Sequence, residues 1–166
     1  MPLLKLLQEQ RQFSVATFGP EPRLAGVLDH LEKELAEVQE ATGDVMEWAD
    51  CFLLCIDGSI RAGGDPSNIV AYMAHRVDLY EAKHQGVWSF HDITSDLLVL
   101  RAHTNQWQRW AIMAYQVWLA AYHHGHSDLI GAAAAKLAIN QARSWPDWRE
   151  SPTDQAIEHI KKFRFS

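Results

Sequence analysis

The feature that most constrains the fold of this chain is the spacing of its apolar residues, which follows the period of an α-helix along most of its length. Few stretches show the strict alternation of apolar and polar residues that marks a half-buried strand. Prolines and glycines interrupt the helical pattern, and each interruption separates one helix from the next. We therefore predict an all-α fold with helices over about 24–41, 45–61, 67–83, 92–123, 127–143 and 153–161.

The composition supports a single globular domain over residues 1–166. Hydrophobic residues make up 48% of the chain and charged residues 22%, a balance that excludes a disordered or fibrous protein. No apolar run reaches the roughly 18 residues that a membrane span needs. The first residues turn polar too early for the core of a signal peptide. We expect a cytoplasmic protein that has no membrane partner.

The net charge indicates which kinds of partner to expect, and the cysteines indicate the redox state of the cellular compartment. The chain has 21 acidic and 15 basic residues and a formal net charge of −6, the opposite of what nonspecific duplex binding favours. We therefore expect a small molecule or a protein as partner, and no nucleic acid. Cys51 and Cys55 lie four residues apart on one predicted helix, where a disulfide between them is disfavoured. Free thiols fit a reducing compartment.

Two consecutive predicted helices each carry a pair of acidic residues three positions apart. Glu34 and Glu37 lie along the edge of the apolar stripe of the first helix. Glu47 and Asp50 interrupt an otherwise apolar run in the second helix. Ionised acids in apolar surroundings are costly unless they are paired or bound to a metal. The four carboxylates are therefore candidates for a functional site.

These four carboxylates converge if the two helices pack antiparallel across the short turn at 42–44. Their repulsion at close range would be strong, and a hard divalent cation such as Mg²⁺ or Mn²⁺ would relieve it. The alternative is that the acids are solvated or salt-bridged surface groups. Asp57 lies on the same side of the helix as Asp50. It is either a further ligand, or a residue that supports a ligand, or an ordinary acid near the helix end.

A basic counterpart stands near the other end of the sequence. Lys136, Asn140 and Arg143 are four and three residues apart, so they share one face of an alanine-rich helix. A point charge, an amide and a planar guanidinium suit the phosphates or the sugar of a nucleotide. The alternative is a solvated basic face.

Three further motifs allow a functional interpretation and a structural one. The histidines His123, His124 and His126 lack a standard zinc spacing, and we favour a polar helix end over a zinc site. The motif Glu81-x-x-His84 resembles half of a di-iron site, but no second such motif completes it. A third motif is an aromatic and apolar stripe that predicts core packing, with base stacking by a tryptophan as the alternative. The stripe consists of Trp107, Trp110, Ala114, Val117 and Ala121. Trp48 and Trp145 are two further candidates for base stacking.

Taken together, the acidic and basic motifs resemble those of the MazG-like all-α nucleoside triphosphate pyrophosphohydrolases. Further blocks resemble the dATP/dGTP diphosphohydrolase branch of that superfamily, which includes the phage MazZ enzymes that serve the synthesis of 2-aminoadenine genomes. These blocks are Phe18-Gly19-Pro20, Arg23, His30-x-x-Lys33-Glu34-Leu35, Glu47-Trp48-x-Asp50, Asp57-Gly58, Arg61-x-Gly63, Arg143-x-Trp145-Pro146-Asp147 and Asp154-Gln155-x-x-Glu158-His159.

The resemblance implies a MazG-like helical bundle that forms a homodimer or a homotetramer. Its catalytic core would comprise about 13–64 and 127–162. The residues between, about 66–126, would form an additional helical insert, since the relatives compared have only a brief connection there. The insert could extend the bundle, build a subunit interface or shape the base pocket.

The resemblance also implies a mechanism. Two or three Mg²⁺ or Mn²⁺ ions would bind the triphosphate and lower the pKa of a water, a carboxylate would take its proton, and attack at the α-phosphorus would release pyrophosphate. The residues implied are Glu34, Glu37, Glu47 and Asp50 as metal ligands, Glu34 or Glu37 as catalytic base, and Lys136, Asn140, Arg143 and Trp145 as substrate-binding residues.

Three functions remain open at the level of sequence. The first is a metal-dependent dATP/dGTP pyrophosphohydrolase whose dGMP feeds 2-aminoadenine nucleotide synthesis. The second is a housecleaning enzyme of the same superfamily with broad or noncanonical nucleotide substrates. The third is a noncatalytic helical module that binds a nucleotide or a partner, which the presence of all four carboxylates disfavours. No motif specifies the base, which the shape of the pocket would decide.

Overall fold

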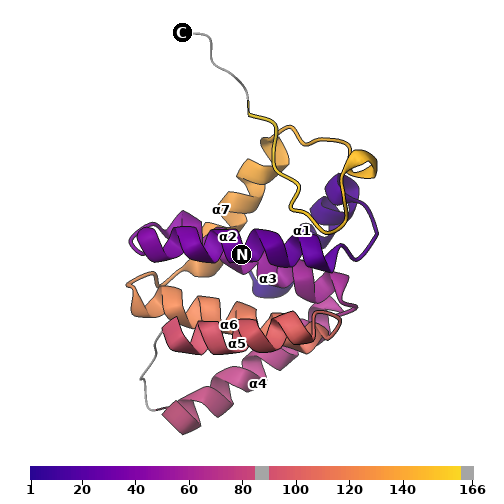
Figure 1. The fold of residues 1–166 in the computed structure, drawn as a ribbon. Coiled ribbons are helices and arrows are strands. Elements are labelled where there is room, and N and C mark those ends of the chain that lie inside the picture. The colour runs from indigo at the N-terminus through magenta and orange to yellow at the C-terminus, as the bar shows by residue number, and fades with distance from the viewer. Residues whose placement is uncertain (85–89, 162–166) are drawn as a thin grey trace.

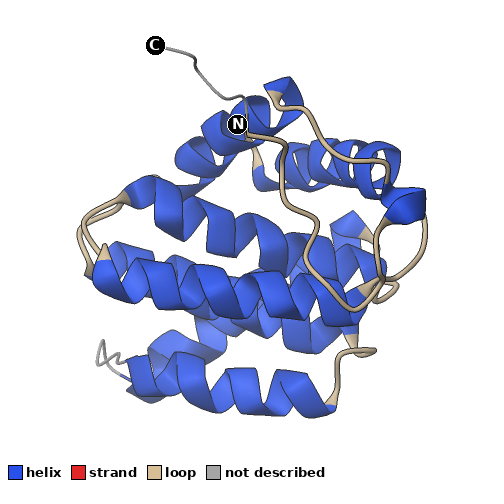
Figure 2. Ribbon diagram, turned by 45° about the horizontal axis from the view of Figure 1, so that its top comes forward, coloured by secondary structure: helices blue, strands red, loops and turns tan. Residues whose placement is uncertain are grey.

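The computed structural model describes residues 1–84 and 90–161, apart from the side chains of 77–84. Within these residues every regular element is helical and no strand occurs, as Figure 1 and Figure 2 show, so the predicted all-α fold is confirmed. The elements are α1 (Leu3–Phe18), α2 (Leu24–Glu40), α3 (Val45–Arg61), α4 (Pro66–His84), α5 (Phe90–Ala102), α6 (Trp107–His123), α7 (Leu129–Ala142) and the short 3₁₀ helix η1 (Trp148–Glu150).

The helix predicted over 92–123 is in fact two helices. α5 ends at Ala102 and α6 begins at Trp107. The turn between them is held by the indole of Trp110, whose Nε1 donates a hydrogen bond to the carbonyl oxygen of Thr104 at 2.8 Å. The turn contains neither proline nor glycine, which is why the pattern of breakers did not predict it.

The prediction of a helix over 153–161 is wrong. This segment is irregular, and its backbone groups bond to partners distant in sequence. The amide of Ala156 donates to Oδ2 of Asp29 at 3.3 Å, and the amide of Ile160 donates to the carbonyl of Ser144 at 2.8 Å. These tertiary hydrogen bonds satisfy polar groups that a helical ladder would otherwise have to satisfy.

Helix α1 was not predicted, because its inward face is only half apolar. The buried residues of α1 are Leu6, Leu7, Gln10 and Ser14. Two polar residues at buried positions remove the periodic apolar signal on which helix prediction depends. The structure explains Ser14, which accepts hydrogen bonds from the guanidinium of Arg61 on α3.

Helix α3 lies at the centre of the bundle. It packs against α1, α2, α6 and α7 and buries Trp48, Phe52 and Ile56 completely. Its most extensive contact is with α6, where a Cβ at Gly58 would overlap the indole of Trp110. Helix α6 belongs to the predicted insert, so this part of the chain supplies core residues rather than a peripheral addition.

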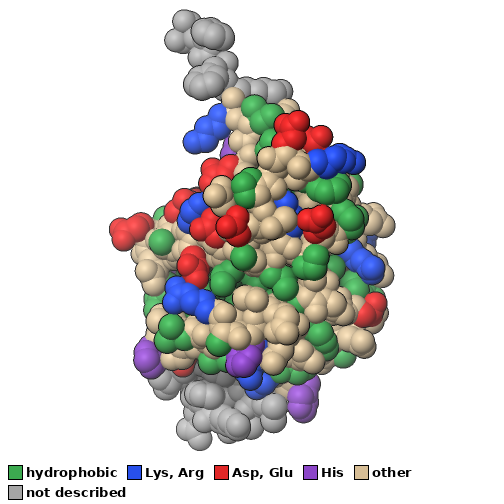
Figure 3. All heavy atoms as spheres, turned by 45° about the vertical axis from the view of Figure 1, so that its right-hand side comes forward, with side chains coloured by type: hydrophobic (Ala, Val, Ile, Leu, Met, Phe, Trp, Pro, Cys, Tyr) green, Lys and Arg blue, Asp and Glu red, His purple; other side chains and the backbone are tan. Residues whose placement is uncertain are grey.

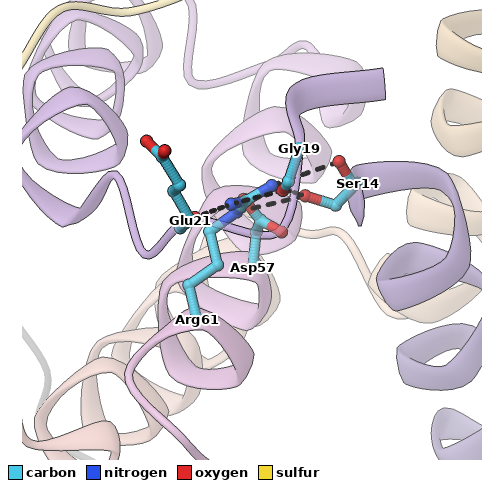
Figure 4. Close-up of polar contacts among 5 residues, drawn as sticks. All are labelled: Ser14, Gly19, Glu21, Asp57 and Arg61. Atoms are coloured by element: carbon cyan, nitrogen blue, oxygen red, sulfur yellow. Dashed lines mark hydrogen bonds and ion pairs between the residues drawn. The ribbon is translucent and has the colours of Figure 1, made fainter. Parts of the chain in front are cut away.

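An arginine near the end of α3 joins it to α1 and to the connection between α1 and α2 (Figure 4). The guanidinium of Arg61 donates to the Ser14 hydroxyl at 2.7 Å, to the Gly19 carbonyl at 3.2 Å and to the Glu21 carbonyl. It also pairs with Oδ2 of Asp57 at 3.0 Å, and both side chains are buried. The network fixes the start of α2 relative to α3.

A candidate active site between helices α2, α3 and α7

One pocket, with a volume of about 310 Å³, is lined by all eight residues that the sequence analysis singled out as site residues. It lies between α2, α3, α7 and the segment that follows α7, and its volume suits a small-molecule ligand. The eight residues are Glu34, Glu37, Glu47, Asp50, Lys136, Asn140, Arg143 and Trp145. The structure thus brings the acidic and basic motifs to the same place, while their roles stay predictions.

The acidic wall of the pocket comes from the end of α2 and the start of α3. A connection of only four residues joins these helices, and Asp44 caps α3 by accepting a hydrogen bond from the amide of Met46 at 2.9 Å. One carboxylate oxygen from each of Glu34, Glu37 and Glu47 lies within 4.8 Å of the other two. In the described part of the chain, these three form the one such cluster of acidic, histidine or cysteine side chains.

The acidic wall carries more negative charge than its surroundings neutralise. Burial raises the pKa of Glu47, and repulsion from Glu34, Asp50 and Glu37 raises it further. Burial also raises the pKa of Asp50, although its hydrogen bond to Lys136 acts in the opposite direction. The site therefore favours a proton or another cation among its oxygens.

Two cationic or ionisable partners contact the acids directly. The ammonium of Lys136 on α7 lies 2.7 Å from Oδ2 of Asp50, and both side chains are mostly buried. The imidazole Nε2 of His30, one turn before Glu34 on α2, lies 3.0 Å from Oε1 of that glutamate. Lys136, predicted to contact phosphate, thus joins α7 to α3 through an ion pair in this structure.

The opposite wall is built from the end of α7 and the residues after it. Oδ1 of Asn140 accepts a hydrogen bond from Nη1 of Arg143 at 3.0 Å. The indole Nε1 of Trp145 donates to the carbonyl of Asn140 at 2.9 Å, and its ring packs edge-on against Phe18 with the ring centres 4.9 Å apart. These bonds hold the amide, the guanidinium and the indole together where α7 ends.

Five further residues line the pocket. His30 and Lys33 precede the first glutamate by four residues and one residue on α2, so helical spacing alone places His30 beside it. Glu158, His159 and Lys161 reach the pocket from the segment predicted to be a helix. No periodic signal marks them, although Glu158 and His159 lie in one of the blocks that carry the family resemblance.

Asp57 does not line this pocket. It is paired with Arg61 and lines a smaller, neighbouring cavity, which also contains Arg23 and shares His30 with the pocket. The interpretation of Asp57 as an acid near the end of the helix therefore fits the structure better than that of a further ligand.

The remaining motifs have structural surroundings. His123 ends α6, His124 stacks on Trp48 with ring centres 5.5 Å apart, and Nε2 of His126 lies 2.8 Å from the Thr42 carbonyl. The predicted stripe on α6 packs in the core, where Trp110 is fully buried. The side chains of the motif at 81–84 lie outside the described residues.

In this all-α bundle, a wall of carboxylates faces a wall with cationic side chains across one pocket, an arrangement that suits a phosphorylated small molecule. The family can be named from the sequence comparison: the model of the dATP/dGTP pyrophosphohydrolase family matches residues 6–89 and 84–162, and the chain belongs to this family. It is a nucleoside triphosphate diphosphatase that acts on purine deoxynucleotides. No curated protein and no solved structure matches the chain significantly.

Proposed function

We propose that the pocket between α2, α3 and α7 is the catalytic site for this reaction and that it requires Mg²⁺ or Mn²⁺. The observation that carries the proposal is the close approach of Glu34, Glu37 and Glu47, with oxygens within 4.8 Å of one another. Oxygen donors alone suit hard divalent cations, and the raised pKa of Glu47 marks charge that a cation would neutralise. Asp50 lies in the same pocket and completes the proposed ligand set for two or three ions.

The metal would supply charge neutralisation for the triphosphate and a lowered pKa for the attacking water. Glu37 is the carboxylate best placed to accept the proton of that water. Glu34 is engaged by His30, whereas Glu37 is exposed to the pocket and makes no hydrogen bond among those the structure describes. As the water oxygen bonds to the α-phosphorus, the bond to the α,β-bridging oxygen breaks. The products are a purine deoxynucleoside monophosphate and pyrophosphate.

The basic wall would bind the substrate. Lys136 and Arg143 offer a point charge and a planar fork to the phosphates, and Asn140 offers its amide to the sugar or to a phosphate. Trp145 lines the pocket, and the hydrogen bond from its indole nitrogen to the Asn140 carbonyl holds its ring in place. The ion pair between Lys136 and Asp50 would share the ammonium between the acidic wall and the bound substrate.

The wider biological proposal rests on the resemblance of the motifs to the MazG-like superfamily and its phage MazZ branch. On that basis we propose a homodimer or homotetramer in the host cytoplasm. Its dGMP would feed the synthesis of 2-aminoadenine nucleotides for a phage genome. Mass measurement in solution tests the assembly, and nucleoside analysis of the genome tests the role.

Substitution of single carboxylates tests the metal-site proposal. We expect Glu47→Gln and Asp50→Asn each to lower kcat/KM for dGTP by more than about a hundredfold, because each removes a charged group that stabilises the transition state. Glu32→Gln is the matched control, since Glu32 lies on α2 and pairs with Arg101 outside the pocket. Near-wild-type turnover by either folded pocket variant would contradict the proposed metal site.

A further inference from the structure

Residues 151–161, named here the C-terminal strap, follow an irregular path that is drawn in yellow in Figure 1. They lie against the first turn of α2 at Gly26. Arg23 donates from Nη2 to the Pro152 carbonyl at 2.6 Å and from Nη1 to the Ser151 carbonyl at 3.3 Å. Further along the strap, the amide of Ala156 bonds to Asp29 on α2. The strap is therefore tied to α2 at several points.

Arg23, which holds the strap, adopts an unusual backbone conformation. Its φ is 47° and its ψ is 31°, and among the described residues it is the one non-glycine residue with positive φ. Such a conformation costs an L-residue free energy and persists only when the surroundings hold it. The side chain of Arg23 is buried against the strap, and its hydrogen bonds are the contacts that hold it.

The strap lies directly on α2. A Cβ at Gly26 would clash with the carbonyl oxygen of Gln155, so a glycine is needed at this crossing. This close approach carries the end of the strap to the pocket, which Glu158, His159 and Lys161 line. The position of these three side chains thus depends on how the strap is docked.

His159 lies in a cationic corner of the pocket. Its ring packs edge-on against Trp145 with the ring centres 5.9 Å apart. Burial lowers the pKa of His159, and the positive charges of Arg143, Lys161 and Lys136 lower it further, whereas the charge of Glu158 acts in the opposite direction. Lys136, Arg143 and Lys161 line the same pocket as this imidazole, whose N–H can donate a hydrogen bond. Cations beside such a donor suit a phosphate oxygen.

We propose that the end of the strap, from Glu158 to Lys161, forms a wall of the triphosphate site, where His159 donates a hydrogen bond to a phosphate oxygen of the bound nucleotide. Arg23 acts as the positioning residue that holds the strap. The inference rests on the proposed function, because it takes the pocket between α2, α3 and α7 as the nucleotide site.

Replacement of His159 tests the contact with phosphate. We expect His159→Ala to raise KM for dGTP and dATP about tenfold, the usual effect of losing a hydrogen bond to a charged group. We expect kcat to stay within about threefold, since the contact exists in the bound ground state. His159→Gln keeps an N–H donor and should recover part of the loss. Thr153→Ala, an exposed position on the same strap, is the control and should leave KM unchanged.

Binding measured without turnover separates affinity from chemistry. The probe is a dGTP analogue with a methylene group in place of the α,β-bridging oxygen, titrated by calorimetry in the presence of Mg²⁺. His159→Ala should weaken its binding about as much as it raises KM. Unchanged binding and unchanged KM in a folded His159→Ala protein would overturn the proposed contact.

Two replacements of Arg23 separate the side chain from the backbone. Arg23→Ala removes the guanidinium and keeps the strained φ, whereas Arg23→Gly removes the guanidinium and suits the left-handed backbone. Both should weaken binding of the analogue, and Arg23→Lys should restore part of it. If Arg23 acts through His159, the double variant Arg23→Gly/His159→Ala should lose much less than the product of the two single effects. Fully multiplicative effects would overturn the positioning role.

Failure of this inference is distinguishable from failure of the proposed function. A wild-type protein with no metal-dependent hydrolysis would overturn the proposed function and the inference that rests on it. A wild-type enzyme that is active, with a His159→Ala variant of unchanged KM and affinity, would overturn the inference alone.

Discussion

Glu47 shows most directly what the acidic wall costs the protein. Its carboxylate lies in the first turn of α3, and burial together with repulsion from Glu34, Asp50 and Glu37 raises its pKa. A raised pKa means that the folded state binds a proton more tightly than the unfolded state does. The stability of the metal-free protein should therefore fall as the pH rises from the ordinary value of 4.5 through the raised pKa of Glu47.

We expect Glu47→Gln to make the metal-free protein more stable at neutral pH, because the amide removes the repelling charge. If Mn²⁺ binds at the proposed site, it should raise the Tm of the wild type, and the same substitution should abolish most of that rise, since it removes a proposed ligand. Thermal unfolding in EDTA and in Mn²⁺, over a series of pH values, measures both effects, with Glu32→Gln as control. A lower Tm in EDTA together with an undiminished response to Mn²⁺ would contradict this account of the acidic wall.

At the scale of the element, α3 carries two different polar sites near its two ends. The first turns hold Glu47 and Asp50 in the pocket, and the last turn holds the buried pair of Asp57 and Arg61. Arg61 connects α3 to α1 and to the residues that precede α2, as Figure 4 shows. We interpret this pair as structural, because Arg61 is bonded to Asp57, Ser14 and the backbone before α2, and neither residue lines the pocket.

Removal of Arg61 should therefore destabilise the fold. We expect Arg61→Met to lower the free energy of unfolding by about 3–5 kcal/mol, since it leaves the buried Asp57 carboxylate without its partner. Arg101→Met is the matched control, because Arg101 pairs with Glu32 at the surface and should cost less than about 1 kcal/mol. Urea denaturation measures both variants. Similar losses in the two variants would show that the Arg61 network contributes no more than a surface ion pair.

The individual helices show how far the structure could be predicted from the sequence. Helices α2 and α3 were predicted within one residue of their observed bounds, because their apolar stripes are regular and a short polar turn separates them. The convergence of Glu34 and Glu47 followed from that hairpin. Helix α1 was not predicted, because buried polar residues interrupt its apolar pattern. The irregular path of the strap was not predicted either, because it is held by tertiary contacts with Arg23, Asp29 and Ser144 that no local pattern reveals.

In the pocket too, some features could be predicted from the sequence and others could not. The acidic pairs and the basic trio could be predicted, since each has a helical spacing. The ion pair between Lys136 and Asp50 could not, because it depends on how α7 packs against α3. His159 also could not be placed by periodicity, since it reaches the pocket from an irregular segment whose path is fixed by contacts with α2.

In the whole molecule, charged side chains are distributed unevenly over the surface, and the hydrophobic core beneath includes residues of the predicted insert. On the face seen in Figure 3, acidic side chains gather in the upper half of the view with lysines and arginines among them. In the described part of the chain, no helix has the length and apolar character to cross a bilayer. The family to which the chain belongs identifies its reaction. We propose that the reaction takes place in the pocket between the acidic and basic walls.

A turnover panel shows whether this chain hydrolyses purine deoxynucleoside triphosphates in a metal-dependent reaction. The purified full chain meets each ribo- and deoxynucleoside triphosphate with Mg²⁺, with Mn²⁺ or with EDTA, and the products are separated by chromatography. We predict that dGTP and dATP yield dGMP and dAMP together with pyrophosphate, only when a divalent metal is present. A broad range of substrates would favour the housecleaning function. Turnover that is unchanged in EDTA, or a folded protein that hydrolyses neither dGTP nor dATP with either metal, would contradict the claim.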